Sequence, residues 1–289
     1  MRVHLLDGTY ELFRAHFGSP PRTAPTGEQI SAVLGLMAST LKLLQEEGVT
    51  HLGAAFDSEV LSFRNELFPA YKTDEGMPLE LLPQFPWAEE AMEALGVVVW
   101  RMIDFEADDA LATAAWKYSD EAEQVVILSP DKDMAQCVVG ESPICFDRRK
   151  QAFMDEQGVW DRFGVAPESI PDYLGLMGDA SDGIPGIRAW GAKSSSTLLA
   201  EYAHIEYIPL DANDWKVQVR GAERLAASLR ENRDDALLYR YLATVRRDVP
   251  ITETVDDLEW KGVPRARFLD FCDRWGFTRL RDRPKRWMD

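Results

Sequence analysis

The first 150 residues alternate short runs of apolar and β-branched residues with longer segments of helical periodicity, and this alternation limits the fold more than any other feature. It is typical of βαβ units, in which helices connect parallel strands and cover the faces of the sheet. Strands are expected at residues 3–6, 52–56, 97–100, 125–128 and 144–146. We therefore expect an α/β fold with a mainly parallel sheet and helices on both faces.

The segments between these strands carry the start and stop signals of helices. Helices are expected over residues 28–47, 88–95 and 106–118. The stretch 68–86 contains four prolines, at positions 69, 78, 83 and 86, so it cannot form one long helix. We interpret it as a mobile connection or a broken arch between two strands.

After residue 164 the strand pattern gives way to helical patterns. These cover residues 167–177, 193–202, 222–242 and 264–274, with glycines and prolines concentrated between residues 178 and 191. The change predicts two domains. Residues 1–165 would form an α/β metal-binding core with the arch near 60–95, and residues 166–289 would form a helical domain.

The chain of 289 residues carries 49 Asp and Glu against 32 Lys and Arg, a net charge of −17. A uniformly acidic surface would repel nucleic acid, so the placement of the acids decides whether such a partner fits. Apolar runs are strand-sized, far below the ~18 residues of a membrane span. Asp7 interrupts the apolar start, so we expect no secretory signal, and three scattered cysteines fit a reducing cytoplasm.

Acidic residues follow four successive predicted strands at the point where each strand ends. The carboxyl ends of parallel strands meet at one edge of a sheet, where ligands of open α/β sheets bind. The seven acids are Asp7, Asp57, Glu106, Asp108, Asp109, Asp131 and Asp133. Mutual repulsion of so many carboxylates favours compensation by hard divalent cations, Mg²⁺ or Mn²⁺, and their number indicates at least two ions. Two adjacent metal ions are a standard device for phosphodiester cleavage.

Each acid also has a purely structural explanation. Glu106 and Asp131 are placed to cap helix N-termini, and Asp7 and Asp57 precede small residues that favour turns. A covalent phosphatase is excluded, because the nucleophilic Asp of the motif Asp-x-Asp-Gly-Thr would stand where this chain has Leu5.

Six short blocks occur in one order between about residue 3 and residue 200. They are Leu6-Asp7-Gly8, Phe56-Asp57, Tyr71-Lys72, Glu106-Ala107-Asp108-Asp109, Asp131-Lys132-Asp133 and the glycine-rich run from Gly178 to Ile187. With these blocks the chain resembles the 5′-nuclease (flap endonuclease) family, which includes the amino-terminal domain of bacterial DNA polymerase I and phage 5′-exonucleases. That family has a nuclease core of the PIN type followed by a helix-hairpin-helix domain.

The resemblance implies a metal-dependent, structure-specific 5′-3′ exonuclease or flap endonuclease that hydrolyses phosphodiester bonds at 5′ ends, flaps or nicks of DNA during replication and repair. RNA-primed 5′ ends are a further substrate it implies. It also implies a cytoplasmic monomer that binds no membrane. It adds Asp179 and Asp182 to the seven acids, for a set of nine.

The resemblance also assigns roles within the acid set. The tighter metal site would consist of Asp7, Glu106, Asp108 and Asp131. The second ion, or its bound waters, would be held by Asp57, Asp109, Asp133, Asp179 and Asp182. The catalytic set it implies is Asp108, Asp131, Lys72 and Arg64.

Further residues are implied to bind DNA. Those at the arch and core are Arg14, Arg64, Tyr71 and Lys72, and those at the helix-hairpin-helix are Gly186, Gly191 and Lys193. The backbone carbonyls of Ile184 and Ile187 would hold a monovalent cation such as K⁺. The alternatives are solvated surface cations, a packed Tyr71, and a plain glycine-rich turn between helices.

The chain departs from the family pattern at three places. Relatives usually have Asn at position 183, where this chain has Gly183, and a glycine at position 189, where it has Ala189. After Lys72 it has Asp74 and Glu75, where relatives are basic. Two other functions stay open, a catalytically weak DNA-binding module and a PIN-type ribonuclease. The complete acid set argues against the first, and the glycine-rich run argues against the second.

Overall fold

The computed structural model describes residues 1–73 and 76–288, so Asp74 and Glu75 lie outside the described residues. Two compact units divide the chain. The sheet unit contains residues 1–60, 74–129 and 247–289, and the helix-rich unit contains residues 61–73 and 130–246. Among the described helices, we find none with both the length and the apolar character needed to cross a bilayer.

The sheet unit is built on four parallel strands in the order β3-β2-β1-β4. They are β1 (Arg2–Asp7), β2 (His51–Asp57), β3 (Val98–Met102) and β4 (Gln124–Leu128). In the register Asp7 lies opposite Ala55, and Asp57 lies opposite Met102. The strands therefore end at a common edge, and the residues that follow them start there.

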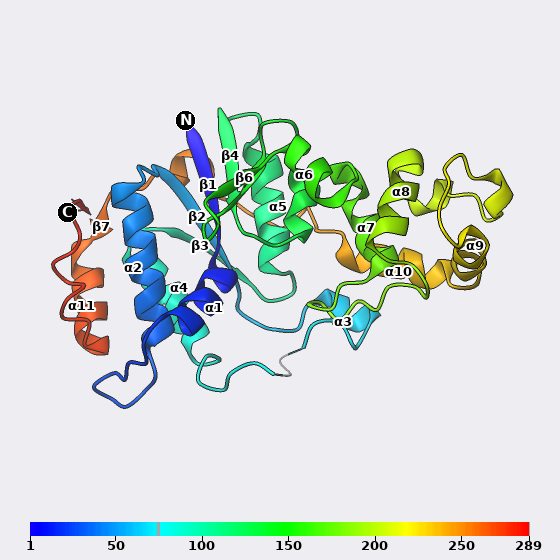
Figure 1. Ribbon diagram of the computed structural model, residues 1–289. Helices are drawn as coiled ribbons and strands as arrows, with labels where there is room; N and C mark the ends of the chain where they lie inside the picture. The colour runs from blue at the N-terminus through cyan, green and yellow to red at the C-terminus, as the bar shows by residue number, and fades with distance from the viewer. Residues whose placement is uncertain (74–75, 289) are drawn as a thin grey trace. The chain divides into compact units, whose positions relative to one another are not determined.

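Helices cover both faces of these strands (Figure 1), which confirms the predicted fold class. On one side lie α1 (Gly8–Gly18), α2 (Ser31–Glu46) and α4 (Gln84–Ala94), and on the other lies α5 (Ala107–Tyr118). Right-handed crossovers explain this split, because the chain moves outward from β1 to β3 and then returns across the sheet to β4. The core between the layers includes Leu5, Phe56 and Tyr118, all fully buried.

Two helices differ from the sequence expectation. Helix α1 was not predicted, because it begins directly at Gly8 without a loop. Gly8 suits this junction, since a Cβ there would lie 2.3 Å from the ring of Phe56. Helix α4 begins at Gln84 rather than at residue 88, because Pro86 stands in its first turn, where the missing N–H costs no hydrogen bond.

Residues 247–288 pack within the sheet unit. They include η5 (Asp256–Leu258), the two-residue parallel strands β7 (Val263–Pro264) and β8 (Trp287–Met288), and α11 (Arg265–Trp275). Helix α11 packs on α4, where Trp87 and Trp275 have ring centroids 4.5 Å apart and Arg274 pairs with Glu90 at 2.8 Å. The compact units therefore do not follow the predicted boundary at residue 165. The division into a core over residues 1–165 and a helical domain over residues 166–289 stays a prediction.

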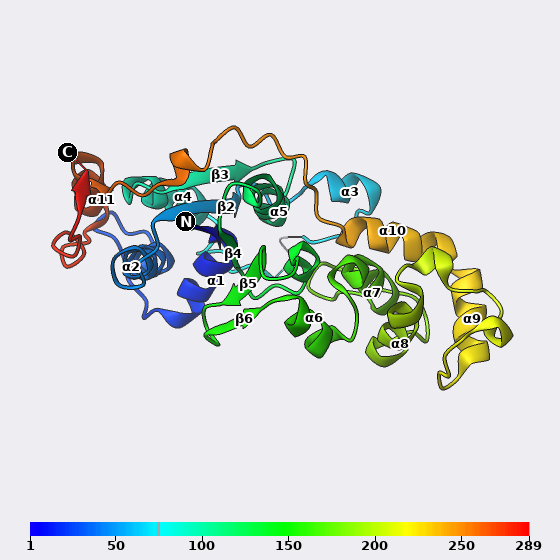
Figure 2. The same cartoon turned by 90° about the horizontal axis from the view of Figure 1, so that it is seen from above.

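The helix-rich unit contains one antiparallel hairpin and most of the short helices (Figure 2). Its elements are α3 (Phe63–Leu67), η1 (Asp133–Cys137), β5 (Ile144–Asp147), β6 (Ala152–Met154), α6 (Glu156–Phe163), η2 (Pro167–Ser169), α7 (Ile170–Met177), α8 (Ala192–Tyr202), η3 (Ile205–Tyr207), η4 (Ala212–Asp214), α9 (Ala222–Glu231) and α10 (Arg233–Ala243). The single helix predicted over 222–242 is two helices. The break is at Asn232, where φ is −120° and ψ is 28° and the side chain donates to the carbonyl of Ser228 at 2.8 Å.

Candidate metal centre and nucleic-acid-binding residues

Asp7 and Asp57 stand at the carboxyl edge of the sheet unit, as predicted, and both are buried. Asp7 caps α1, since its Oδ1 accepts from the Tyr10 N–H at 2.8 Å, and its Oδ2 accepts from the Ser129 hydroxyl at 2.8 Å. Asp57 Oδ1 accepts from the Ala107 N–H at 2.8 Å. Both side chains therefore accept a backbone N–H at the start of a helix, a structural role different from the turn that was the alternative for them. It does not conflict with a site at this edge.

Three further acids surround the start of α5. Glu106 is the N-cap residue and is buried, and Asp109 is fully buried. Asp109 Oδ2 accepts from the Glu106 N–H at 3.0 Å, which satisfies a backbone donor that the helix leaves without an intrahelical partner. Asp108 is half-buried in the same first turn, where the helix dipole favours negative charge. The sheet unit thus brings five of the nine predicted acids to one strand edge.

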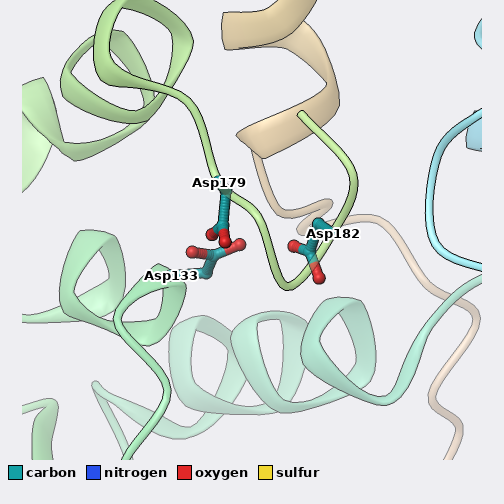
Figure 3. A group of neighbouring side chains, drawn as sticks. All are labelled: Asp133, Asp179 and Asp182. Carbon is teal, nitrogen blue, oxygen red and sulfur yellow. The ribbon is translucent and has the colours of Figure 1, made fainter. Parts of the chain in front are cut away.

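The other four acids belong to the helix-rich unit, and three of them form a cluster. One carboxylate oxygen from each of Asp133, Asp179 and Asp182 lies within 4.8 Å of the others. Figure 3 shows the three side chains and the segments that carry them. Asp133 opens η1, whereas Asp179 and Asp182 lie in the loop after α7. The fourth acid, Asp131, is half-buried and accepts from the Asp133 N–H at 3.1 Å through Oδ1.

The loop that carries Asp179 and Asp182 is a tight hairpin. The Asp179 N–H donates to the Ile184 carbonyl at 2.7 Å, and the Ile184 N–H donates back at 2.8 Å. Gly186, with φ +67°, passes so close to the end of α7 that a Cβ there would lie 2.4 Å from the Gly178 nitrogen. The glycine-rich run therefore fixes the backbone that carries two of the clustered carboxylates.

The two oxygens of Asp179 have different surroundings. Oδ1 accepts from Lys132 Nζ at 2.7 Å, from the Ser181 N–H at 2.9 Å and from the Ser181 hydroxyl. The buried Oδ2 has no hydrogen-bond partner among the described residues. Because an unsatisfied buried carboxylate oxygen is costly, this atom is well placed to act as a ligand for a cation. An all-oxygen donor set suits Mg²⁺ or Mn²⁺, so the residues present fit a divalent ion.

Lys132 and Asp179 also line a pocket of about 670 Å³ in the helix-rich unit. Burial opposes the charge of Lys132, but its hydrogen bond to Asp179 and the attraction of neighbouring aspartates outweigh it, so the pKa of Lys132 is raised above its ordinary value. The ammonium therefore stays charged. Sequence reasoning gave no role to Lys132 or Ser181, although Lys132 stands between Asp131 and Asp133.

The arch residues Arg64 and Tyr71 are buried, with 2% and 3% of their surface exposed. Arg64 donates from Nε to the Leu242 carbonyl at 2.8 Å and from Nη2 to the Thr244 carbonyl at 3.0 Å, and it lies over the ring of Tyr71. Arg64 caps the end of α10, since a guanidinium satisfies helix C-terminal carbonyls. The predicted phosphate contact of Arg64 and the predicted base stacking of Tyr71 stay predictions.

Lys72 is placed by its backbone beside the acidic loop. Its N–H donates to the Asp182 carbonyl at 2.9 Å, and its side chain is half-buried. In the sheet unit, Arg14 donates from Nη2 to the buried Glu11 and to Ser39 Oγ at 2.9 Å. A phosphate contact of either cation stays a prediction.

The remaining predicted residues lie around the hairpin and α8. Lys193 is exposed in the first turn of α8, directly after Gly191 and Ala192. The Ile184 carbonyl accepts from Asp179, and the Ile187 carbonyl accepts from the Trp190 N–H at 3.2 Å. Both carbonyls are therefore engaged within the loop. The K⁺ site stays a prediction.

The structure shows the backbone conformation at Gly183 and Ala189, two of the three positions where the chain departs from the family pattern. Gly183 has φ +71°, and a Cβ there would lie 2.5 Å from the Ala70 carbonyl oxygen, so only glycine fits this approach. Ala189 has φ +73°, a conformation that costs a residue with a Cβ about 1 kcal/mol. The chain therefore keeps the glycine-like turn at residue 189 without the glycine.

Family models match most of the chain. The model for the 5′-3′ exonuclease N-terminal resolvase-like domain matches residues 2–164, and that for the 5′-3′ exonuclease C-terminal SAM fold matches residues 165–266. DNA polymerase I of Bacillus caldotenax is 33% identical over 96% of this chain, and that of Pseudomonas aeruginosa is 35% identical over 92%. The chain spans about a third of the length of these relatives, 31% and 29%.

Solved structures support the same fold. The T5 5′-exonuclease with bound zinc ions has a TM-score of 0.67 at 18% identity, with 98% of this chain and 100% of that chain covered. A bacteriophage T5 flap endonuclease, in a complex with DNA and metal ions, has a TM-score of 0.66 at 18% identity and covers 84% of this chain and 89% of its own. At such identities the likeness concerns the fold alone. Since the family models cover residues 2–266 almost continuously, the chain belongs to the 5′-3′ exonuclease family.

Proposed function

We propose that this chain is a divalent-metal-dependent nuclease that hydrolyses phosphodiester bonds at 5′ ends, flaps or nicks of DNA. The observation that carries the proposal is the cluster of Asp133, Asp179 and Asp182, with its buried oxygen on Asp179 that has no partner among the described residues. Membership of the 5′-3′ exonuclease family supports it. The T5 relatives that were solved with metal ions and DNA support it further.

Different residues would hold the metal ion, neutralise the reacting phosphate and bind the duplex. Asp133, Asp179 and Asp182 would hold one ion, which, when bound, activates a water molecule and offsets charge on the phosphoryl group. The assignment of Asp7, Glu106, Asp108 and Asp131 to a second, tighter site stays a prediction. Lys72 would neutralise a non-bridging phosphate oxygen near the hairpin, and exposed Lys193 at the start of α8 would bind a duplex phosphate.

The finer features of the proposal rest on the resemblance and on composition. We take Mg²⁺ as the resident ion in the cell, with Mn²⁺ as a substitute, because both prefer oxygen ligands. We propose a monomer that acts on DNA, including RNA-primed 5′ ends, in replication and repair in the cytoplasm. The two alternatives are a weakly catalytic DNA-binding module and a PIN-type ribonuclease.

One assay separates these functions. A 5′-labelled flap duplex, a nicked duplex and a single-stranded RNA of equal length are incubated with the protein in Mg²⁺ and in excess EDTA. We expect cleavage of both DNA substrates in Mg²⁺ only, and loss of turnover by orders of magnitude in Asp108→Asn and Asp131→Asn while duplex binding survives. The exposed surface variant Asp161→Asn is the matched control. Cleavage in EDTA would contradict the metal dependence, and cleavage of the RNA alone would favour the ribonuclease.

A further inference from the structure

Lys132 lies beside the proposed metal cluster, although a lysine is not a metal ligand when it is charged. Its Nζ lies 2.7 Å from Asp179 Oδ1 and 3.0 Å from Ser181 Oγ, and 27% of its side chain is exposed. An ammonium group cannot coordinate a cation, and it repels one electrostatically. A lysine paired with a carboxylate of the proposed metal cluster must therefore act on that cluster in another way.

The geometry of Asp179 indicates that action. Three donors hold Oδ1, namely Lys132 Nζ and the N–H and hydroxyl of Ser181, while the buried Oδ2 has no hydrogen-bond partner in the described part of the chain. These contacts fix the carboxylate rotamer and leave a single oxygen for an ion. Outer contacts of this kind orient metal ligands and tune the affinity of the site.

We propose that Lys132 is a positioning residue that makes Asp179 a monodentate ligand and weakens divalent-ion binding by offsetting one carboxylate charge of the cluster. The proposal rests on the proposed function, because it takes the cluster to be a metal site. Three carboxylates alone would bind an ion tightly without substrate. With Lys132 beside Asp179, the ion binds fully only when a phosphate of the substrate adds a further oxygen ligand and a negative charge.

Lys132 and Ser181 both contact Asp179 but should have different effects on metal affinity. Lys132 brings a full positive charge, whereas Ser181 brings only neutral donors to the same oxygen. Removing Lys132 takes away repulsion while Ser181 still orients Asp179, so metal affinity should rise. Removing the Ser181 hydroxyl takes away orientation while the charge stays, so metal affinity should not rise.

The test is a Mn²⁺ titration of the full chain without DNA, followed by the electron paramagnetic resonance signal of free Mn²⁺. Loss of a binding step in Asp179→Asn identifies the step that belongs to the cluster. For that step we expect about tenfold tighter binding in Lys132→Met and Lys132→Gln, and wild-type affinity in Lys132→Arg. Ser181→Ala should bind equally or more weakly.

Lys150 provides the matched control. It is an exposed lysine of the same unit that pairs with Asp147 at 3.7 Å, so Lys150→Met removes the same charge away from the cluster and should leave this step unchanged. Thermal unfolding confirms that each variant is folded. Unchanged or weaker Mn²⁺ binding in folded Lys132→Met or Lys132→Gln would overturn the proposal.

Different results would contradict the proposed nuclease function and the proposed role of Lys132. If the wild-type protein cleaves no flap or nick but Lys132→Met binds Mn²⁺ more tightly, the nuclease function is wrong and the role of Lys132 stands. If cleavage requires metal but Lys132 variants bind Mn²⁺ like the wild type, the nuclease function stands and the role of Lys132 is wrong.

Discussion

The acids of the sheet unit and those of the hairpin in the helix-rich unit belong to one predicted set, yet their carboxylates are held differently. At the sheet edge, Asp7, Asp57 and Asp109 each accept a backbone N–H at the start of a helix. In the hairpin, Asp179 is held on one oxygen by Lys132 and Ser181, and its buried Oδ2 lacks a partner within the described residues. The sheet-edge acids therefore also serve as acceptors in the fold, whereas the hairpin acid keeps one oxygen available for the proposed ion.

The largest effect that would test this difference is expected from Asp179→Asn. The amide keeps the shape of the side chain but removes a ligand charge, so turnover on a flap duplex should fall by about a hundredfold or more. The rise in thermal midpoint that Mg²⁺ gives the wild type should also shrink. Both are measured with and without Mg²⁺. An equal metal-induced rise in the variant would show that Asp179 is no ligand.

At the sheet edge the expected effect is on folding. Asp109→Ala removes the acceptor of the Glu106 N–H, so the free energy of unfolding in EDTA should fall by about 1–2 kcal/mol. Urea unfolding in EDTA measures this contribution without any metal. The exposed cap variant Asp155→Ala, at the start of α6, is the control for an ordinary capping contribution. If Asp109→Ala loses no stability without metal, the proposed contrast between the two regions is wrong.

The hairpin itself should tolerate no side chain at its closest approach. Gly186→Ala places a Cβ 2.4 Å from the Gly178 nitrogen at positive φ, so we expect a loss of about 2–3 kcal/mol in stability together with weaker metal binding. At Gly191 the backbone is extended and the described atoms leave open space around a Cβ. Gly191→Ala should therefore have little effect on stability or on metal binding. Denaturant unfolding and a Mn²⁺ titration compare the two variants.

Substitutions at Arg64 and Lys193 should have different effects, the first on stability and the second on DNA binding. Arg64→Met leaves carbonyls at the end of α10 without their donor, so stability should fall by about 1–3 kcal/mol. Exposed Lys193→Ala should keep stability but weaken duplex binding for all sequences and lower the salt slope by about one unit. Unfolding curves and binding at several salt concentrations measure both. A stable Arg64→Met protein with weaker DNA binding would support the predicted phosphate contact and contradict the packing role.

The smallest effect is expected at Ala189. Because φ is +73° there, Ala189→Gly relieves strain but also increases the entropy of the unfolded chain, so the gain in stability should be about 0.5 kcal/mol. The same change at Ala227, in the middle of α9, should instead cost about 1 kcal/mol. The two variants are compared by denaturant unfolding. A rise in the free energy of unfolding for Ala189→Gly and a fall for the helix variant would confirm the turn conformation at residue 189.

The sequence predicted the parts of the fold that depend on local pattern. Strands β1 to β4 were recognised because apolar runs bounded by acids are local signals, and the acids that follow β1, β2 and β3 lie at one edge of the sheet unit. Helix α1 was missed, because β1 passes into it at Gly8 without a loop. The break at Asn232 was also missed, because the apolar pattern continues through it.

Within the site, the sequence identified the carboxylates but not the contacts that orient them. Arg64 reaches Leu242 and Thr244, and the Gln136 side chain donates to the Ala243 carbonyl at 2.9 Å, so residues far apart in the chain cap the same helix end. No local pattern encodes such contacts. The motif around Lys132 likewise showed a cation between two acids but not which carboxylate it pairs with.

The proposed function requires that the cluster of Asp133, Asp179 and Asp182 holds a divalent ion. Crystals grown with MnCl₂ and measured near the manganese absorption edge test it directly. We expect an anomalous peak about 2.1–2.2 Å from Asp179 Oδ2, with Oδ1 still bound to Lys132 and Ser181. Well-ordered crystals with manganese bound elsewhere and no peak beside Asp179 would contradict it.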